Sequence, residues 1–523
     1  MEALKELTMI VTRNKIKKID IIGEQDETQT RIHELYELVK GGQVESDEDA
    51  ASMLFPEDCN GISYRKLKSD LLRRLTNTLF FIDVKKASYS DRQSAYYTCY
   101  RDYAAAYILQ GKNARVACMN MCHKILRHSE KYEFNDLNRD VSKMLCLFYG
   151  SLMGDVPQYE KYKEKFQYYD QVVAMENEAE FLYNDLIVQY VNNSSSKTEL
   201  REVALRFYQR LEPWLASCDA YRLHLYASLI HLMVYTTVND YAGALAVCDQ
   251  MIRFFEAKPY DSFTPLKIAY YQKMACYTQL RQYDEGKSTA EKCLTMLDEG
   301  SYNWFKYYEL YFMLAMHSGK YREAFEIFVL VTEHSRFRFL PENVIETWKI
   351  YKAYLHFLIN SGHITIDSED GQFSKFRLGR FLNNIPIYSK DKRGMNIAIL
   401  SIQIIFLIFQ KKYSAAIDRM EAIEKYCSRY LQTPETIRSY YFIKMLLTIP
   451  AASFHLAGVS RLSQKYLDQL KASPLEEANQ AYKIEIIPYE ELWDLVLETL
   501  DNSFHQAKKN QSGLSDKNQA LRG

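Results

Sequence analysis

Apolar residues recur along much of this chain at the spacing that places them on one face of an α-helix. The clearest example is the segment 304–331, where two apolar stripes are separated by a break at Ser318-Gly319-Lys320. The first stripe consists of Tyr308, Tyr311, Phe312 and Ala315, and the second consists of Tyr321, Ala324, Phe325 and Phe328. Glycine at the break can adopt the left-handed conformation that ends a helix. The pattern therefore predicts two amphipathic helices that pack as an antiparallel pair.

The pattern of the second helix recurs at three other places in the chain. In each copy a tyrosine is followed three positions later by a small residue. The four pairs are Tyr241 and Ala244, Tyr283 and Gly286, Tyr321 and Ala324, and Tyr413 and Ala416. A small side chain is expected where two helices cross closely, because a larger one would push them apart. The recurrence predicts an array of tandem helix pairs.

The motifs Asn239-Asp240-Tyr241-x-x-Ala244 and Gly319-Lys320-Tyr321-x-x-Ala324-x-x-x-Phe328 resemble the turn and second helix of tetratricopeptide repeats. The resemblance covers about residues 220–335 and, more loosely, 395–430. The units here are longer than the 34-residue period of that family, and their first helix lacks its usual Leu-Gly pair. The resemblance implies an all-α fold, an α-solenoid of antiparallel helix pairs with a concave surface that binds a peptide or protein.

Three other regions differ from this array. Residues 1–92 form a small N-terminal module, with a partly alternating segment at 17–23 and helices expected at 28–40, 47–54 and 64–81. The array is expected to span residues 93–506, interrupted near 365–394 by acidic, Asn/Pro and basic loop signals. Residues 507–523 are polar, with no apolar face, and are expected to be disordered.

Composition favours a long-helix protein of the cytoplasm. The 523 residues include only 18 Gly and 11 Pro but 42 Tyr, so helix breakers are few and bulky packing residues are many. The ten Cys form no C-x-x-C pair, which is typical of reduced thiols in a cytosolic protein. The most apolar run, 397–409, is shorter than the roughly 20 residues of a membrane span, so a buried helix is expected there.

No motif in the sequence predicts catalysis. Gly286-Lys287-Ser288 lacks the glycine five residues earlier that a phosphate-binding loop needs. Cys118 and Cys122 share a helical face, but His123 does not, so core thiols are favoured over a metal site. We therefore expect no enzyme activity, no cofactor and no metal, and a protein that binds a protein or peptide partner as a scaffold or sensor.

In a tetratricopeptide-like array the first helices line the concave surface. Counting back from each turn predicts the partner-binding residues Tyr226, Leu229, Met233 and Thr236 in one unit, Tyr271 and Thr278 in the next, and Lys306, Glu309, Met313 and Met316 in the third. Tyrosine and methionine provide adaptable apolar contacts, and the polar residues can hold a peptide backbone. The alternative that Tyr226, Leu229 and Met233 belong to the core stays open.

A basic helix in the N-terminal module supports an alternative function. Between Gly61 and Arg92 there are eight Lys and Arg against three Asp, although the whole chain has a net charge of −1. The cations that could contact nucleic acid are Arg65, Lys66, Lys68, Arg73 and Arg74. Two helices followed by a basic helix is the order of a helix-turn-helix or winged-helix module, which would indicate a transcription regulator with a helical sensor domain. The competing interpretation is an ordinary solvated helix that packs through its leucines.

Overall fold

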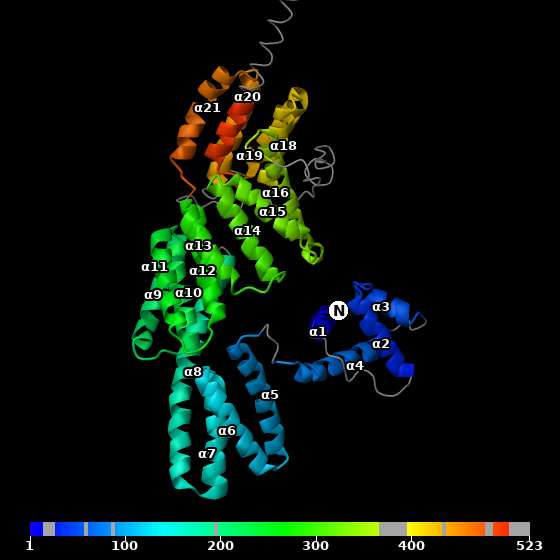
Figure 1. Cartoon of the computed structure of the whole chain (residues 1–523), viewed down its shortest axis with the longest axis vertical. Helices are drawn as coiled ribbons and strands as arrows, with labels where there is room; N and C mark the ends of the chain where they lie inside the picture. The colour runs from blue at the N-terminus through cyan, green and yellow to red at the C-terminus, as the bar shows by residue number, and fades with distance from the viewer. Residues whose placement is uncertain are drawn as a thin grey trace, which may run out of the picture. The chain divides into compact units, whose positions relative to one another are not determined.

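The computed structural model describes residues 1–13, 27–56, 61–84, 89–192, 197–365, 395–430, 436–475 and 485–500 (Figure 1). All regular structure in these residues is helical, which confirms the all-α prediction. Most helices pack against their neighbours in sequence, as in a solenoid. The chain divides into two compact units, Met1–Ala174 and Met175–Gly523.

The first unit opens with four helices that share a hydrophobic core. They are α1 (Glu2–Arg13), α2 (Glu27–Lys40), α3 (Asp47–Leu54) and α4 (Ile62–Thr78). Helix α4 buries Tyr64, Leu67, Leu71 and Leu75, one face at helical spacing, against α1, α2 and α3. The expected helices at 28–40, 47–54 and 64–81 are thus confirmed, the last of them ending in the short 3-10 turn η1 (Leu79–Phe81). The segment 17–23 lies outside the described residues.

The rest of the first unit begins a series of antiparallel helices. It comprises α5 (Asp91–Gly111), α6 (Arg115–Lys131), α7 (Asn135–Leu147), the π-helical turn η2 (Phe148–Met153) and the first half of the long α8 (Val156–Val191), whose second half belongs to the second unit. Tyrosines on α5 reach across to carboxylates on α7. The hydroxyl of Tyr103 lies 3.0 Å from Oδ2 of Asp140, and that of Tyr100 bonds to Asp136. These contacts join the first helices of two consecutive pairs.

The second unit is also built of helices that pack against their neighbours in sequence. Its helices are α9 (Lys197–Leu215), α10 (Tyr221–Thr236), α11 (Tyr241–Glu256), α12 (Phe263–Leu280), α13 (Tyr283–Leu294), α14 (Tyr302–His317), α15 (Tyr321–Glu333), the 3-10 turn η3 (Phe337–Phe339), α16 (Glu342–Asn360), α18 (Met395–Phe409), α19 (Tyr413–Tyr430), α20 (Ile437–Ala451), α21 (Leu456–Lys471) and a further helix at 489–500. Most of the predicted interruption at 365–394 and the whole tail at 507–523 lie outside the described residues.

The turns inside the helix pairs share one geometry. In each, the residue two positions before the second helix has a positive φ, as at Asn239, Arg281, Gly319 and Lys411. The next amide donates back to a carbonyl five residues earlier; the amide of Lys320, for example, lies 2.8 Å from the oxygen of Ala315. This is the Schellman geometry that satisfies the last carbonyls of a helix. The sequence predicted the positions of these turns, and the structure shows that the turns share the same backbone conformation.

The small residues lie where the sequence predicts close packing. Ala244, Ala324 and Ala416 have no exposed surface. A Cβ atom placed on Gly286 would come within 2.5 Å of Cδ2 of Leu314, so only glycine fits there without movement of that leucine. The register assigned to these helices is therefore confirmed.

Helix α18 contains the most apolar run of the sequence and is buried on several sides, as predicted. Among the described residues, no helix is both long and apolar enough to cross a membrane.

Candidate binding surfaces

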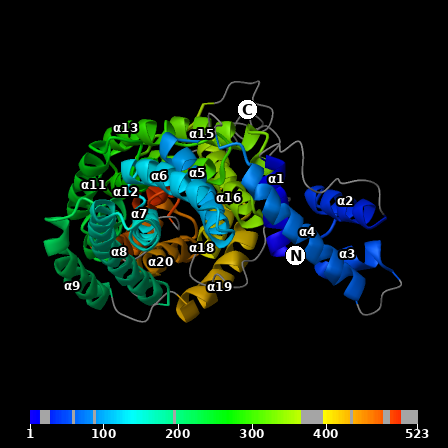
Figure 2. The ribbon, with the colours of Figure 1, turned by 90° about the horizontal axis from the view of Figure 1, so that it is seen from below.

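The first helices of the second unit form what we call its inner face, the side of α10, α12, α14 and α16 that faces away from the second helices α11, α13 and α15. Figure 2 shows α11, α13 and α15 on the outside of α12 and α16. Six of the predicted partner-binding residues keep part of their surface exposed. They are Tyr226, Leu229, Met233 and Thr236 on α10, Tyr271 on α12 and Lys306 on α14. A partner could therefore touch these side chains without unfolding the array.

The other four predicted residues are buried, and their assignment to an open groove is corrected. Thr278 on α12 has no exposed surface, and its hydroxyl donates to the carbonyl of Met274 at 2.8 Å. Glu309, Met313 and Met316 on α14 are buried as well. The reason is that α14 is covered on almost every side, whereas period counting assumed that one side faced solvent.

A polar cluster beside Tyr226 was not predicted. Arg222 on α10 bonds to Glu180 on α8 and lies 3.6 Å from Glu176, whose side chain is fully buried. The rings of Tyr226 and Tyr183 are 5.7 Å apart, and burial raises the pKa of Tyr226, as does the nearby Glu180. The cluster joins two helices that are separated in sequence, so no local motif reveals it.

A second cluster lies around Tyr271. Nζ of Lys306 is 2.7 Å from Oε2 of the buried Glu309, and its charge also lies 5.9 Å from the ring of Tyr302. Burial, together with the charge of Glu309, raises the pKa of Tyr271 to about 12, so its hydroxyl stays protonated at neutral pH. This end of α14 therefore combines a half-buried cation with aromatic surface.

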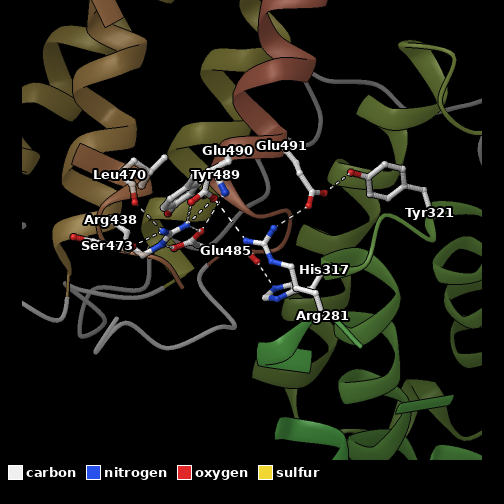
Figure 3. Close-up of polar contacts among 10 residues, drawn as sticks. All are labelled: Arg281, His317, Tyr321, Arg438, Leu470, Ser473, Glu485, Tyr489, Glu490 and Glu491. Carbon is white, nitrogen blue, oxygen red and sulfur yellow. Dashed lines mark hydrogen bonds and ion pairs between the residues drawn. The ribbon is translucent and has the colours of Figure 1, made fainter. Parts of the chain in front are cut away.

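The end of the inner face away from Lys306 is filled by residues 485–500 of the chain itself (Figures 2 and 3). Arg438 on α20, which is completely buried, anchors this segment. Its Nε lies 2.7 Å from Oε1 of Glu485, which is also completely buried, and its Nη2 contacts Glu485 and Glu490 at 3.0 and 2.8 Å. The third nitrogen, Nη1, donates to the carbonyl of Leu470 at 3.2 Å. All three guanidinium nitrogens thus have partners.

The same segment is tied to the turns of two distant repeats (Figure 3). Nη1 of Arg281, in the turn between α12 and α13, lies 3.2 Å from Oε1 of Glu491. The hydroxyl of Tyr321, at the start of α15, donates to the other oxygen of that carboxylate at 3.3 Å. His317 contacts the carbonyl of Glu485 at 2.7 Å. The helix at 489–500 therefore contacts repeats that are far from it in sequence.

Buried apolar side chains also hold residues 485–500 in the second unit. Ile487, Leu492 and Trp493 have no exposed surface, and Tyr489 stacks on Phe442 with ring centroids 4.3 Å apart. Burial of side chains of this size contributes roughly 1.5–3 kcal/mol each. Because this segment already covers its end of the inner face, the exposed end near α10 and α12 is the better candidate for a partner.

The predicted cations of α4 do not all face the same way. Arg65, Lys66 and Arg73 are exposed, whereas Lys68 and Arg74 are half-buried. Nζ of Lys68 lies 2.8 Å from both oxygens of Asp47 on α3, a contact that helps to hold the pKa of that carboxyl well below its usual range. Arg74 lies 3.4 Å from Asp70 on its own helix.

Cys118 and Cys122 are buried, and burial raises the pKa of Cys122 to about 12, as expected for unreactive core thiols. Within the described residues, no group of three His, Cys, Asp or Glu side chains could hold a metal ion.

Comparison with known proteins finds no matching family model, no similar curated protein and no similar solved structure.

Proposed function

We propose that this protein works by binding a peptide or a segment of a partner protein on the inner face of its second unit, without catalysing a reaction. One observation carries the proposal. Aromatic and aliphatic side chains of consecutive first helices, Tyr226, Leu229 and Met233 on α10 and Tyr271 on α12, stay partly exposed, and the ion-paired cations Arg222 and Lys306 come from α10 and α14. Our assignment of the repeats to a tetratricopeptide-like type belongs to the same proposal.

The chemistry of these residues suits a partner with apolar side chains. Tyrosine offers a large contact surface and loses little conformational freedom on binding, and methionine adapts to different shapes. The partly exposed Lys306 and Arg222 can interact with carboxylates or backbone carbonyls of a partner, because each of them keeps about a third of its side chain accessible. We therefore expect a mixed apolar and acidic segment.

The test compares two double variants of the full chain. Leu229→Glu/Met233→Glu places charge on the inner face, and Leu205→Glu/Leu330→Glu places the same charge at exposed positions on α9 and α15. Each variant is used to capture partners from the source cells, with quantitative mass spectrometry, and its melting temperature is measured. We expect both variants to melt within a few degrees of the parent and only the inner-face variant to lose its specific partner.

Two outcomes would count against the proposal. Equal capture by both variants would show that the partner binds elsewhere. A large loss of melting temperature in the inner-face variant alone would show that Leu229 and Met233 are core residues, because a buried unpaired carboxylate is strongly destabilising.

A further inference from the structure

The N-terminal module contains a hollow that the sequence did not predict. It has a volume of about 560 Å³ and lies between α2, the end of α3 and α4. Its polar lining consists of Arg31, Ser63, Lys66, Ser69, Asp70 and Arg73. Arg31 comes from α2, so the cations of α4 are joined by one that is 35 positions earlier in the sequence than Lys66.

The arginines of the hollow are held in place by the module. The guanidinium of Arg31 lies over the ring of Phe55, 4.7 Å from its centroid. The guanidinium of Arg73 bonds to Asp70, with Nε at 3.2 Å from Oδ1. A guanidinium that is already positioned loses less freedom when it binds an anion.

The charge of the hollow is positive. Arg31, Lys66 and Arg73 supply three positive charges and Asp70 supplies one negative charge, which leaves a net charge of +2. Hydrogen bonds from Arg73, the nearer of its two arginine partners, lower the pKa of Asp70, so this carboxylate stays ionised and accepts no proton from a ligand near neutral pH. The hydroxyls of Ser63 and Ser69 add two further groups that can donate hydrogen bonds.

The cations are spread along a line rather than gathered around one point. Lys66 and Arg73 are seven residues apart on α4, which corresponds to about 10 Å along the helix axis. A single phosphoryl group reaches only one part of such a row, whereas a polymer of phosphates reaches all of it.

We propose that Arg31, Lys66 and Arg73, together with Ser63 and Ser69, bind the sugar-phosphate backbone of a nucleic acid. The contact is to phosphates and is independent of base sequence. Lys68 and Arg74 take no part, since they are half-buried and do not line the hollow. This site is separate from the peptide surface of the second unit, and either proposal can fail without the other.

The experiment measures binding of the full chain to fluorescent oligonucleotides of equal length, as duplex DNA, single-stranded DNA and single-stranded RNA, each in two unrelated sequences. Fluorescence polarisation is recorded from about 50 to 300 mM salt, because phosphate contacts weaken steeply over this range. The site variant is Arg31→Glu/Lys66→Glu. The matched control is Lys40→Glu/Lys112→Glu, which makes the same charge change at exposed positions of the same unit. A phosphoserine peptide is the competing probe.

We expect the parent and the control to bind at least one form of nucleic acid with equal affinity for both sequences. The site variant should lose at least tenfold in affinity at the lowest salt concentration. For duplex DNA, its slope of log affinity against log salt should be shallower by about 1.8, since each phosphate contact contributes roughly 0.9. Equal loss in the site variant and the control would overturn the assignment of this hollow.

Failure of every nucleic acid to bind at about 50 mM salt would also overturn the proposal, as would binding of the phosphoserine peptide alone. Circular dichroism checks that the site variant is folded. If it is not, Arg31→Gln/Lys66→Gln, which removes both charges but keeps the side chains polar, is tested in its place with the same expected loss.

Discussion

Replacement of Arg438 by leucine tests how firmly residues 485–500 are held in the second unit. Arg438 is completely buried and pairs with Glu485, which is also completely buried, and with Glu490. Removal of the guanidinium leaves the Glu485 carboxylate buried without its cation. Loss of one partner from a buried ion pair is destabilising by about 3–5 kcal/mol. The two carbonyls of Leu470 and Ser473 lose a donor as well.

The double variant Arg438→Leu/Glu485→Leu separates the ion pair from the rest of the contacts. With both charges removed, no charge is left buried without a partner, and replacement of a buried pair by apolar residues is often nearly neutral. We therefore expect the double variant to be more stable than Arg438→Leu alone. The matched control is Arg322→Leu, which removes an exposed pair with Glu326 and should change stability by no more than about 0.5 kcal/mol.

The assay is hydrogen exchange of the backbone amides in 489–500, read by mass spectrometry, together with urea unfolding. Exchange is needed because a chain with two compact units does not have to unfold in one step. Arg438→Leu should accelerate exchange in this segment far more than the control does. The reasoning is refuted if the free energy of opening falls by less than about 1 kcal/mol, because the pair would then not hold the segment.

The pH dependence of the stability lost in Arg438→Leu is an independent test of the same prediction. Burial raises the pKa of Glu485 above its ordinary value of 4.5, and Arg438 opposes that rise. Without Arg438 the folded-state pKa rises further, so the folded variant prefers the protonated acid. The destabilisation is then fully present at pH values above the folded-state pKa and diminishes as the pH falls toward 4.5.

Three further substitutions test the repeats. Ala324→Leu should lower the stability of the second unit by about 1–3 kcal/mol in thermal melting, because Ala324 has no exposed surface and a larger side chain overpacks the helix crossing; unchanged melting would contradict the register. Lys411→Gly should raise stability by about 0.5–1 kcal/mol, because Lys411 has φ of 58° and glycine adopts this conformation without strain. In contrast, Lys425→Gly inside α19 should lower it by about 1 kcal/mol, and equal effects of the two glycines would disprove the explanation.

The local parts of the fold were predictable from sequence. Breaks such as Gly319-Lys320 form within one helix pair, so the few residues around each break are enough to predict it. Small residues such as Ala324 and Ala416 recur at a fixed position after each break, so their burial could be predicted too. Each of these predictions is confirmed.

The binding surfaces were less predictable because they depend on contacts between distant residues. Helical spacing gives the side of α14 on which Met313 and Met316 lie but not whether another segment covers that side. Likewise, the sequence around Lys66 contains no sign of Arg31, which reaches the same hollow from another helix. A sequence pattern predicts a face, and only the packed structure shows what lies against it.

The position of residues 485–500 has a consequence for how the protein is made. Arg281 precedes its partner Glu491 by 210 residues, and His317 precedes the Glu485 carbonyl by 168. At a synthesis rate of about 5–20 residues per second, the turn that contains Arg281 leaves the ribosome roughly 10–40 s before its partner exists. Repeats of this kind can form one after another from local contacts. The inner face near α14, however, stays exposed to solvent until residues 485–500 have been synthesised. Cellular chaperones could therefore bind this exposed surface during a defined period, which ends when the helix at 489–500 has been synthesised.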